Sequence, residues 1–380
     1  MSWEKVRLGD VTDSCLGKML DQAKNKGEYQ PYLANLNVRW GTFDLDNLSQ
    51  MKFEDNEQER YGLKYGDLVV CEGGEPGRCA IWKDQIPGMK IQKALHRVRV
   101  HDCLDYRYLF YWFLLAGKQG TLEQYFTGAT IKHMPGQKLK SVIIDMPPLN
   151  TQHRIADILS AYDDLIENNQ KQIKLLEEAA QRLYKEWFVN LRFPGYEHTK
   201  ITDGVPERWE KRTVGSLIDK PIRTKQIPTA DYQTDGMIPV IDQSREFISG
   251  YTNDTESFVQ SNVPVIVFGD HTRILKLIQF PFAKGADGTQ LICSSSNHMP
   301  QRLLYCSLLN IDLSNYHYAR HFKYLKAEVI FVPTMEIANL FESIAEPLYT
   351  KVQRCREICH QAQQARDRLL PKLMSGEVEV

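Results

Sequence analysis

The sequence lacks any long apolar run. No stretch among its 380 residues approaches the roughly 20 apolar residues that a membrane-spanning helix needs, and the first ten residues are too polar for a signal peptide. The eight cysteines are scattered without the spacing of a disulfide framework. Neither Pro (17) nor Gly (23) is frequent enough to indicate long disorder. We therefore expect a folded, cytoplasmic protein with reduced cysteines and no membrane association.

The sequence also lacks the short motifs of several enzyme classes. A phosphate-binding loop is excluded because Thr12 and Trp112 stand where its first glycine is required. The stretch DMPPLN superficially resembles the catalytic tetrapeptide of amino-methyltransferases, but Met146 interrupts it and Leu149 replaces the aromatic residue that would stack on the target base. Catalytic-triad motifs, a His-Glu-x-x-His pair and a dinucleotide fingerprint are all missing. We expect a binding protein without catalytic residues.

The chain contains its own beginning twice. A length of 380 residues exceeds what one hydrophobic core usually serves, so at least two domains are expected. The WEK start of residues 3–10 returns in residues 209–216, at an offset of 206. The stretch LKSVIIDMPPL (139–149) corresponds to LKAEVIFVPTM (325–335), at an offset of 186. The second repeat has therefore lost 20 residues internally while keeping both ends, which indicates one scaffold with two different interiors.

Each repeat ends in a segment with a heptad pattern. Between Ile155 and Trp187 the pattern positions lie alternately four and three residues apart, the spacing of a helix that packs along its length against another helix. Adding 186 gives a second set, from Phe341 to Leu373, in which nine of ten residues are apolar when Ala and Cys are counted. We expect the two helices to pair with each other as a rod on the order of 50 Å long. The expected seam is Ile155, Leu159, Tyr162, Ile166, Asn169, Ile173, Leu176, Leu183 and Trp187 in the first helix, with Phe341, Leu348, Val352, Leu369 and Leu373 in the second.

Two polar features of this seam have competing interpretations. A lone Asn at such a position commonly fixes helix register, but Asn169 could equally point into solvent, and the sequence leaves both open. Cys355 occupies the equivalent position of the second helix. Together with Cys359 and His360 it suggests a metal site only weakly, because the remaining ligands of a zinc site are missing. We expect no metal.

The pattern predicts four parts in an α+β chain. Two pseudo-repeated mixed α/β domains alternate with two long helices. The expected boundaries are 1–147 for the first domain, 148–190 for the first helix, 191–332 for a linker and the second domain, and 333–380 for the second helix. Within the domains, LKYGDLVVCEGG and SNVPVIVFGDH each predict a strand that ends at a turn. DYRYLFYWFLLAG and QRLLYCSLLN predict buried helices at matching places.

These features together resemble the DNA specificity subunit of Type I restriction-modification systems, over essentially the whole chain. The local resemblance lies in GDLVVCEGGEPGRCAIW, KIQKALHRVRV, FGDHTRILKLIQFPFAKGADGTQL, YARHFKYLKAEVIFVP and PPLNTQHRIADILSAYDDLIENN. The resemblance implies two target-recognition domains and two helical regions that pair as an antiparallel coiled coil. One departure is that the second helical region has no counterpart of Gln152-His153-Arg154.

The resemblance also implies the partners. The chain would bind double-stranded DNA and dock two methyltransferase subunits, with restriction subunits as further partners. S-adenosylmethionine, ATP and Mg²⁺ would belong to those partners, so we expect no cofactor in this chain. Two domains held apart by a rod would each read a few base pairs and leave those between unread, which gives a bipartite target with a fixed gap. A rod of this length would place the half-site centres roughly one DNA turn apart.

The charge pattern and the residue chemistry provide candidate DNA contacts. Residues 42–77 hold nine acidic and three basic residues, whereas residues 78–140 hold eleven basic and four acidic ones. A basic face and a chance run of solvated charges explain this contrast equally well. Arg and Lys suit guanine edges and phosphates, and Gln and Asn suit adenine. The candidates are Arg78, Lys90, Gln92, Lys93, Lys132, His133 and Gln137 in the first domain, and His271, Thr272, Arg273, Lys284, Gln290, His317, Arg320, His321 and Lys323 in the second. Tyr32, Asn35, Arg39 and Trp40 form a second-rank group.

Two other functions remain as alternatives. The chain could be a coiled-coil interaction scaffold that does not itself read DNA, in which case DNA retention by its complex would be absent or insensitive to salt. It could also be a restriction or modification enzyme with an active site in one domain, which the missing motifs disfavour.

Overall fold

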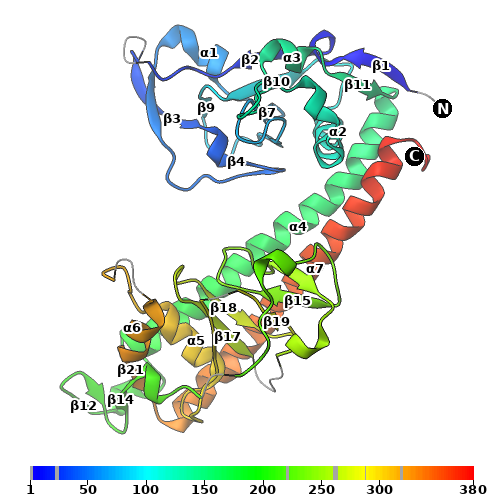
Figure 1. Ribbon diagram of the computed structural model, residues 1–380. Helices are drawn as coiled ribbons and strands as arrows, with labels where there is room; N and C mark the ends of the chain where they lie inside the picture. The colour runs from blue at the N-terminus through cyan, green and yellow to red at the C-terminus, as the bar shows by residue number, and fades with distance from the viewer. Residues whose placement is uncertain (1–2, 22–24, 220–221, 260–263, 287, 317–319) are drawn as a thin grey trace. The chain divides into compact units, whose positions relative to one another are not determined.

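The computed structural model describes residues 3–21, 25–219, 222–259, 264–286, 288–316 and 320–380 (Figure 1). The chain divides into two compact units. Unit 1 comprises Met1–Glu167 and His360–Val380, and unit 2 comprises Asn168–Cys359. Each unit combines one mixed domain with parts of two long helices, so the predicted α+β class is confirmed, while the four-part division along the chain stays a prediction. No helix in the described ranges is long and apolar enough to cross a membrane.

Unit 1 is built around a four-stranded sheet with the order β2-β10-β7-β8. A second sheet, β6-β3-β9, and the short pairs β1-β11 and β4-β5 complete it. The predicted strand in LKYGDLVVCEGG is β7, which is buried on both faces, and the predicted apolar helix is α2. The strands are β1 Glu4–Arg7, β2 Thr12–Leu16, β3 Glu28–Leu33, β4 Val38–Arg39, β5 Thr42–Phe43, β6 Gln50–Phe53, β7 Leu68–Cys71, β8 Cys79–Ile81, β9 Lys90–Ile91, β10 Leu95–Val100 and β11 Ile143–Met146; the helices are α1 Gln58–Tyr61, α2 Tyr106–Gln119 and α3 Gly136–Lys140.

Unit 2 repeats this plan, with a three-stranded central sheet in the part of the chain that the structure describes. Its central sheet has the order β18-β17-β20 and its second sheet β16-β15-β19. The predicted strand in SNVPVIVFGDH is β17, and QRLLYCSLLN forms α5. The strands are β12 Ile201–Thr202, β13 Val205–Pro206, β14 Glu210–Thr213, β15 Ile238–Ile241, β16 Gly250–Thr252, β17 Val265–Gly269, β18 Leu275–Ile278, β19 Ala283–Lys284, β20 Thr289–Ile292 and β21 Val329–Val332; the helices are α5 Gln301–Leu309 and α6 His321–Ala327.

The two ends of each repeat pair with each other as strands. In unit 1, β1 pairs antiparallel with β11, and Glu4 lies opposite Met146. In unit 2, β14 pairs antiparallel with β21, and Glu210 lies opposite Val332. The two offsets found in the sequence, 206 (210 − 4) and 186 (332 − 146), relate these registers residue by residue. The ends are retained because together they form the strand pair from which each domain leads into its long helix.

The long helices are α4 (Leu149–Tyr184) and α7 (Met335–Met374), which Figure 1 draws side by side in green and in orange to red. In unit 1, Leu159 of α4 shares a buried cluster with Leu370 of α7, and Arg366 forms an ion pair with Asp163. The early part of α4 therefore packs against the late part of α7.

The same antiparallel pairing holds within unit 2. Tyr184 of α4 shares a buried cluster with Phe341 and Ala345 of α7, and Arg356 Nη2 lies 2.6 Å from Glu177 Oε1. All fourteen residues of the expected seam are buried or half-buried. Asn169 is only 4% exposed, which favours the register interpretation over a solvated side chain.

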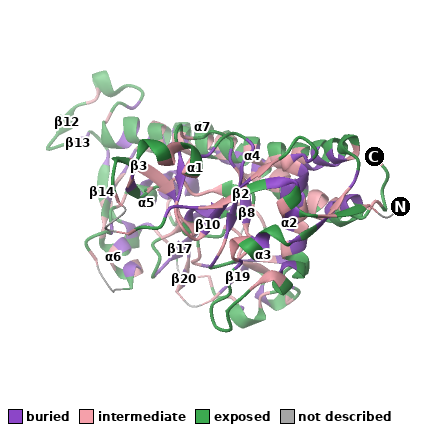
Figure 2. Ribbon diagram, turned by 90° about the horizontal axis from the view of Figure 1, so that it is seen from above, coloured by how far each residue is buried: buried purple, intermediate pink, exposed green. Residues whose placement is uncertain are grey.

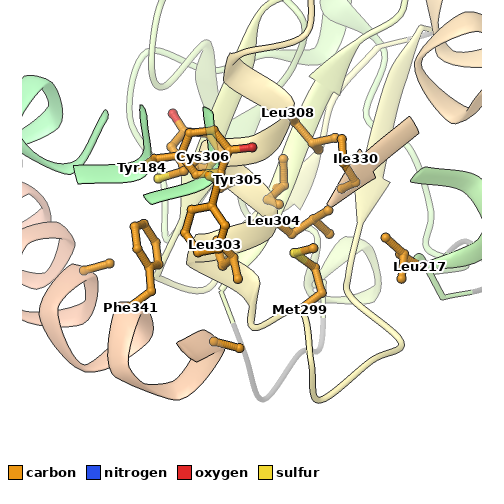
Figure 3. Packing of buried hydrophobic residues seen from close by; sticks show 14 of the residues in the cluster. Tyr184, Leu217, Met299, Leu303, Leu304, Tyr305, Cys306, Leu308, Ile330 and Phe341 are labelled. Carbon is orange, nitrogen blue, oxygen red and sulfur yellow. The ribbon is translucent and has the colours of Figure 1, made fainter. Parts of the chain in front are cut away.

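The core of unit 2 joins its domain to both helices. Its largest cluster contains residues of the central sheet, α5, α4 and α7. Figure 3 shows Tyr305 and Leu303 of α5 beside Phe341 of α7 and Tyr184 of α4. A helix pair that contributes aromatic side chains to a domain core is part of that domain's fold.

The Gln152-His153 pair fastens α4 to the domain of unit 1. Gln152 is 1% exposed; its Nε2 donates to Pro147 O at 2.9 Å, and its Oε1 accepts from Asp105 N at 2.9 Å. His153 Nδ1 lies 2.7 Å from Asp105 Oδ2. Asp105 caps the N-terminus of α2, whereas Pro300 stands before α5 in unit 2. The second repeat has no carboxylate at this place, which explains why it lacks the Gln-His pair.

Candidate nucleic-acid interface

Four separate segments of unit 1 converge at one end of its central sheet. Glu72, which follows β7, donates its backbone N–H to Ala94 O at 2.8 Å and accepts the N–H of Met134 at 2.7 Å. Arg78 Nη2 donates to Asn35 O at 2.9 Å. These bonds join the β7–β8 turn to the β9–β10 turn, to the segment before α3 and to the end of β3. We name Asn35, Gly73, Gly74, Arg78, Lys93 and His133 the first loop cluster.

Two glycines allow these segments to approach closely. A Cβ atom on Gly73 would lie 2.9 Å from Nδ1 of His133, and one on Gly74 would lie 3.0 Å from Nδ2 of Asn35. Gly74 also has a φ of +79°, in the left-handed region that glycine tolerates best. The glycines of the β7–β8 turn therefore bring an imidazole and an amide from distant parts of the chain against one turn.

Unit 2 brings together the equivalent four segments with the same two backbone hydrogen bonds. Asp270, which follows β17, donates its N–H to Gly288 O at 2.7 Å and accepts the N–H of His321 at 3.0 Å. Thr272 Oγ1 donates to Gln243 O at 2.6 Å. Glu72 and Asp270 thus occupy equivalent positions. We name Gln243, His271, Thr272, Gly288 and Arg320 the second loop cluster.

The candidate DNA contacts differ widely in exposure. The exposed ones are Lys132, His133 and Gln137 in unit 1 and His271, Thr272, Arg273, Arg320 and Lys323 in unit 2. The half-buried ones are Arg78, Gln92, Lys93, Lys284 and Gln290. Of the second-rank group, Arg39 is exposed, and Tyr32, Asn35 and Trp40 are half-buried. His317 lies outside the described residues.

Two candidates are unsuited to DNA contact. Lys90 is 4% exposed, and its Nζ donates to Gly88 O at 2.8 Å. His321 is 5% exposed, and its ring nitrogens lie 2.8 Å from Asp270 O and 2.8 Å from Tyr316 O. Both side chains hold neighbouring backbone in place, which a count of basic residues along the sequence does not reveal.

Three other candidates, one of them in the first loop cluster, already bind protein groups. Arg78 pairs with Glu75 at 2.8 Å in addition to its bond with Asn35, and Arg273 Nη1 donates to Leu313 O at 2.9 Å. Lys132 lies 3.4 Å from a carboxylate oxygen of Glu123, and both side chains are exposed. Exposed ion pairs of this kind contribute little to stability, so Lys132 can exchange its partner for a phosphate at low cost.

Sequence reasoning missed Gln243, which is central to the second loop cluster. Its Oε1 accepts the backbone N–H of His271 at 3.1 Å, and a Cβ on Gly288 would lie 2.7 Å from its Nε2. The available signal was its place two residues after the apolar run that forms β15, but the 20-residue shortening of the second repeat obscures the alignment there.

A buried lysine supports the loop that carries Gln243. Lys276 of β18 is 4% exposed; its Nζ donates to Asp242 O at 2.9 Å and to Glu246 O. Burial lowers the pKa of this ammonium group to about 8, although the nearby Asp242 and Glu246 carboxylates oppose the shift. By binding these two backbone carbonyls, the lysine holds residues 242–246 in place.

Replacing this lysine in the variant Lys276→Met is expected to destabilise unit 2 by about 1–3 kcal/mol, because two buried carbonyls lose their donor. A lysine with a folded pKa near 8 and an unfolded pKa of 10.5 stabilises the fold increasingly as pH rises between these values, since the unfolded chain binds more protons. The difference in melting temperature between wild type and Lys276→Met should therefore widen from pH 8 to pH 10. The exposed control Lys323→Met should show no such widening. Equal behaviour of both variants would contradict the proposed support of residues 242–246 by Lys276.

A second kind of surface lies on the long helices. In unit 1, Ile158, Ala161 and Leu165 form an exposed apolar row on α4, at heptad spacing and off the seam. In unit 2, Leu340, Ile344 and Pro347 form an exposed apolar row on α7. Ile158 and Ile344, 36% and 39% exposed, are equivalent in the repeat, and Figure 2 shows exposed turns along both helices. We name these sets the first and second apolar rows.

Across the described ranges, no three His, Cys, Asp or Glu residues gather as metal ligands. The loop clusters instead offer amides, imidazoles, guanidinium groups and hydroxyls, which hydrogen-bond to base edges and phosphates.

Comparison with known proteins agrees with this geometry. Residues 1–178 match the model of the Type I restriction modification DNA specificity domain. The chain is 27% identical over 343 residues to the Type I restriction enzyme MjaIX specificity subunit of Methanocaldococcus jannaschii, covering 83% of this chain and 78% of the relative. It is 28% identical over 222 residues to the MjaVIII specificity subunit of the same organism, covering 57% and 49%. Among solved structures, it resembles the Type-I restriction-modification system S subunit from M. genitalium with a TM-score of 0.58 and 17% identity, covering 98% and 96% of the two chains.

Proposed function

We propose that this chain, as a member of the family of Type I restriction-modification specificity subunits, reads a bipartite DNA target. We also propose that it assembles the enzymes that act there. The observation that carries the proposal is the pair of equivalent loop clusters, one in each unit. Each cluster gathers hydrogen-bonding groups from four segments at one end of a central sheet. Two equivalent loop clusters in one chain imply that the DNA target has two half-sites.

Direct reading of bases requires groups that reach the major groove, where each base pair shows a distinct pattern of donors and acceptors. The exposed members His133, His271, Thr272 and Arg320 are suited to bases or phosphates. Different side chains at equivalent positions predict two different half-sites. Base pairs between them would remain unread, which gives the fixed gap.

The two apolar rows support the docking of two copies of one partner. A heptad-spaced apolar row that is left exposed is suited to packing against a helix of another chain. Because Ile158 and Ile344 are equivalent in the repeat, the same partner surface can bind each unit. We propose that two methyltransferase subunits dock there, and that restriction subunits join the assembly through them.

Catalysis then belongs to the partners. S-adenosylmethionine, ATP and Mg²⁺ would be bound by the methyltransferase and restriction subunits, and this chain would supply specificity without a cofactor of its own. The assembly would work in the cytoplasm. Because partner subunits can contribute phosphate contacts, a net charge of −1 is compatible with DNA binding.

The assembled complex should retain DNA in a strongly salt-dependent way, because phosphate contacts release counterions. Binding of the complex to a target duplex can be measured at a series of salt concentrations. A steep linear fall of log affinity with log salt supports the DNA-reading function. Absent or salt-insensitive retention would favour the alternative of an interaction scaffold that does not read DNA.

Inserting one heptad into each long helix tests the origin of the gap. The insertions are placed at Glu167/Asn168 in α4 and at Cys359/His360 in α7, where the chain passes from one unit to the other. Seven residues lengthen a helix by about 10 Å, which corresponds to about three base pairs of duplex. Sequencing of methylated DNA should show unchanged half-sites and a gap about three base pairs longer. Active variants with an unchanged gap would contradict a role for the helices in spacing.

A further inference from the structure

Unit 1 contains a cavity beside Trp3, where the tail of α7 meets the start of α4. Its volume is about 790 Å³, within the range of protein ligand sites. Trp3 is only half-buried and Val378 is exposed, so the cavity is open to solvent. We name it the Trp3 cavity; its apolar lining includes Trp3, Met146, Pro147, Ile155, Leu373 and Val378.

The equivalent place in unit 2 is filled by aromatic side chains. Trp209 corresponds to Trp3 at the offset of 206, but it is only 6% exposed. The ring centroids of Phe193 and Phe188 lie 4.6 and 5.5 Å from that of Trp209. Leu191 packs against the same buried cluster. The segment that follows α4 therefore covers Trp209 with its own apolar side chains.

Smaller side chains leave this space open in unit 1. The offset of 186 relates Trp187 to Leu373 and Phe341 to Ile155. In unit 2 the rings of Trp187 and Phe341 meet at a centroid distance of 6.0 Å, whereas Leu373 and Ile155 line the cavity in unit 1. The tail of α7, residues 375–380, contains no aromatic residue. The loss of these rings accounts for the cavity, because close-packed interiors otherwise leave few voids of this size.

The Trp3 cavity continues into the first apolar row. Thr151 lines the cavity and lies seven residues before Ile158. Residues seven apart lie on the same face of a helix. A partner that docks on the first apolar row therefore lies next to the opening of the cavity.

The charge of the lining indicates what kind of side chain the cavity binds. The exposed carboxylate residues Glu4 and Glu379 also line it. In unit 2, the segment that covers Trp209 carries Arg192 between its two apolar residues. An aromatic residue beside a basic one is therefore complementary to both the apolar lining and the carboxylates.

Resting on the proposed function, we propose that the Trp3 cavity binds an aromatic side chain of the methyltransferase subunit that docks on the first apolar row. A basic residue next to this aromatic residue pairs with the carboxylates at the cavity. The partner thus supplies in unit 1 the ring that the chain itself supplies in unit 2.

The peptide Leu-Arg-Phe-Pro-Gly, which copies residues 191–195, is a probe for the cavity. It is labelled with a fluorophore and titrated with the complete chain, and fluorescence anisotropy measures binding. Wild type should bind this peptide. A peptide with alanine in place of phenylalanine should bind about 10-fold more weakly or worse, because the buried ring is lost.

Two variants fill the cavity from within the chain. Leu373→Trp introduces the residue that unit 2 has at this place, and Val378→Trp does so from an exposed position, which keeps the test valid if the buried substitution impairs folding. Both should lower peptide affinity about 10-fold or more. The control Leu175→Trp adds the same side chain at a position of α4 that is 64% exposed, and it should bind the peptide normally.

The same variants are then titrated with the methyltransferase subunit, and native mass spectrometry counts the bound copies. Val378→Trp should bind one copy as wild type does and the other about 10-fold more weakly. Equal binding of both copies by wild type and both filled variants would overturn the inference while leaving the proposed function standing. Failure of wild type to bind the peptide would also overturn it. A wild-type chain that binds the peptide but no methyltransferase subunit would overturn the proposed function as well.

Discussion

The double variant Ile158→Glu/Ile344→Glu is expected to lose methyltransferase binding and with it all DNA methylation. Each substitution places a carboxylate within an apolar row, where a docked helix would bury it without a partner. Central interface residues of this kind commonly contribute 2 kcal/mol or more, and burying an unpaired charge costs more still. Copurification with a tagged methyltransferase subunit, followed by a methylation assay, measures the effect.

Single variants and a matched control make this result specific. Ile158→Glu and Ile344→Glu should each release one of two partner copies, so that the mass of the complex falls by one subunit. Leu175→Glu alters another exposed leucine of α4, 64% exposed and outside both rows, and should bind normally. Full assembly of the double variant, or equal loss in Leu175→Glu, would show that the rows are not the docking surfaces.

Phe341→Ala is expected to destabilise unit 2 by about 3–5 kcal/mol. Phe341 is fully buried, and its ring meets those of Tyr184, Trp187 and Phe188 at centroid distances of 6.4, 6.0 and 5.4 Å. Removing the ring leaves a cavity where α4, α7 and the domain core join. Chemical denaturation, followed by the fluorescence of Trp187 and Trp209, measures the loss.

The conservative variant Phe341→Leu separates packing from other effects. It keeps most of the apolar volume and should cost less than half as much as Phe341→Ala. Limited proteolysis should show earlier cleavage within unit 2 of Phe341→Ala. A stability equal to wild type would contradict the view that the helix pair is an integral part of this core.

Most of what could be predicted about the fold came from the internal sequence repeat. Two short matches with different offsets predicted a common scaffold, and the structure relates the pairs Glu4–Met146 and Glu210–Val332 by those same offsets. The pairing of the two ends as antiparallel strands could not be predicted, because the sequence pattern of a four-residue strand does not identify the strand with which it pairs. The heptad pattern was readable because it extends over many turns, and Asn169 is buried as a seam position should be.

The candidate site was less predictable for physical reasons. Residue type alone selected Lys90 and His321, but a two-residue strand and a helix start bury these side chains against backbone carbonyls. Gln243 was missed because its equivalence to Asn35 depends on parallel strand pairing, which local sequence does not encode. Loops from four distant segments form each cluster, so only the fold brings them together.

The most direct test of the account is the methylation pattern of the unaltered protein. The chain is coexpressed with its methyltransferase subunit in cells without adenine methylation, and the genome is sequenced for modified bases. Methylated adenines are expected in a bipartite motif, with two different half-sites separated by a gap of constant length. Methylation at one contiguous site, or none from an intact complex, would contradict it.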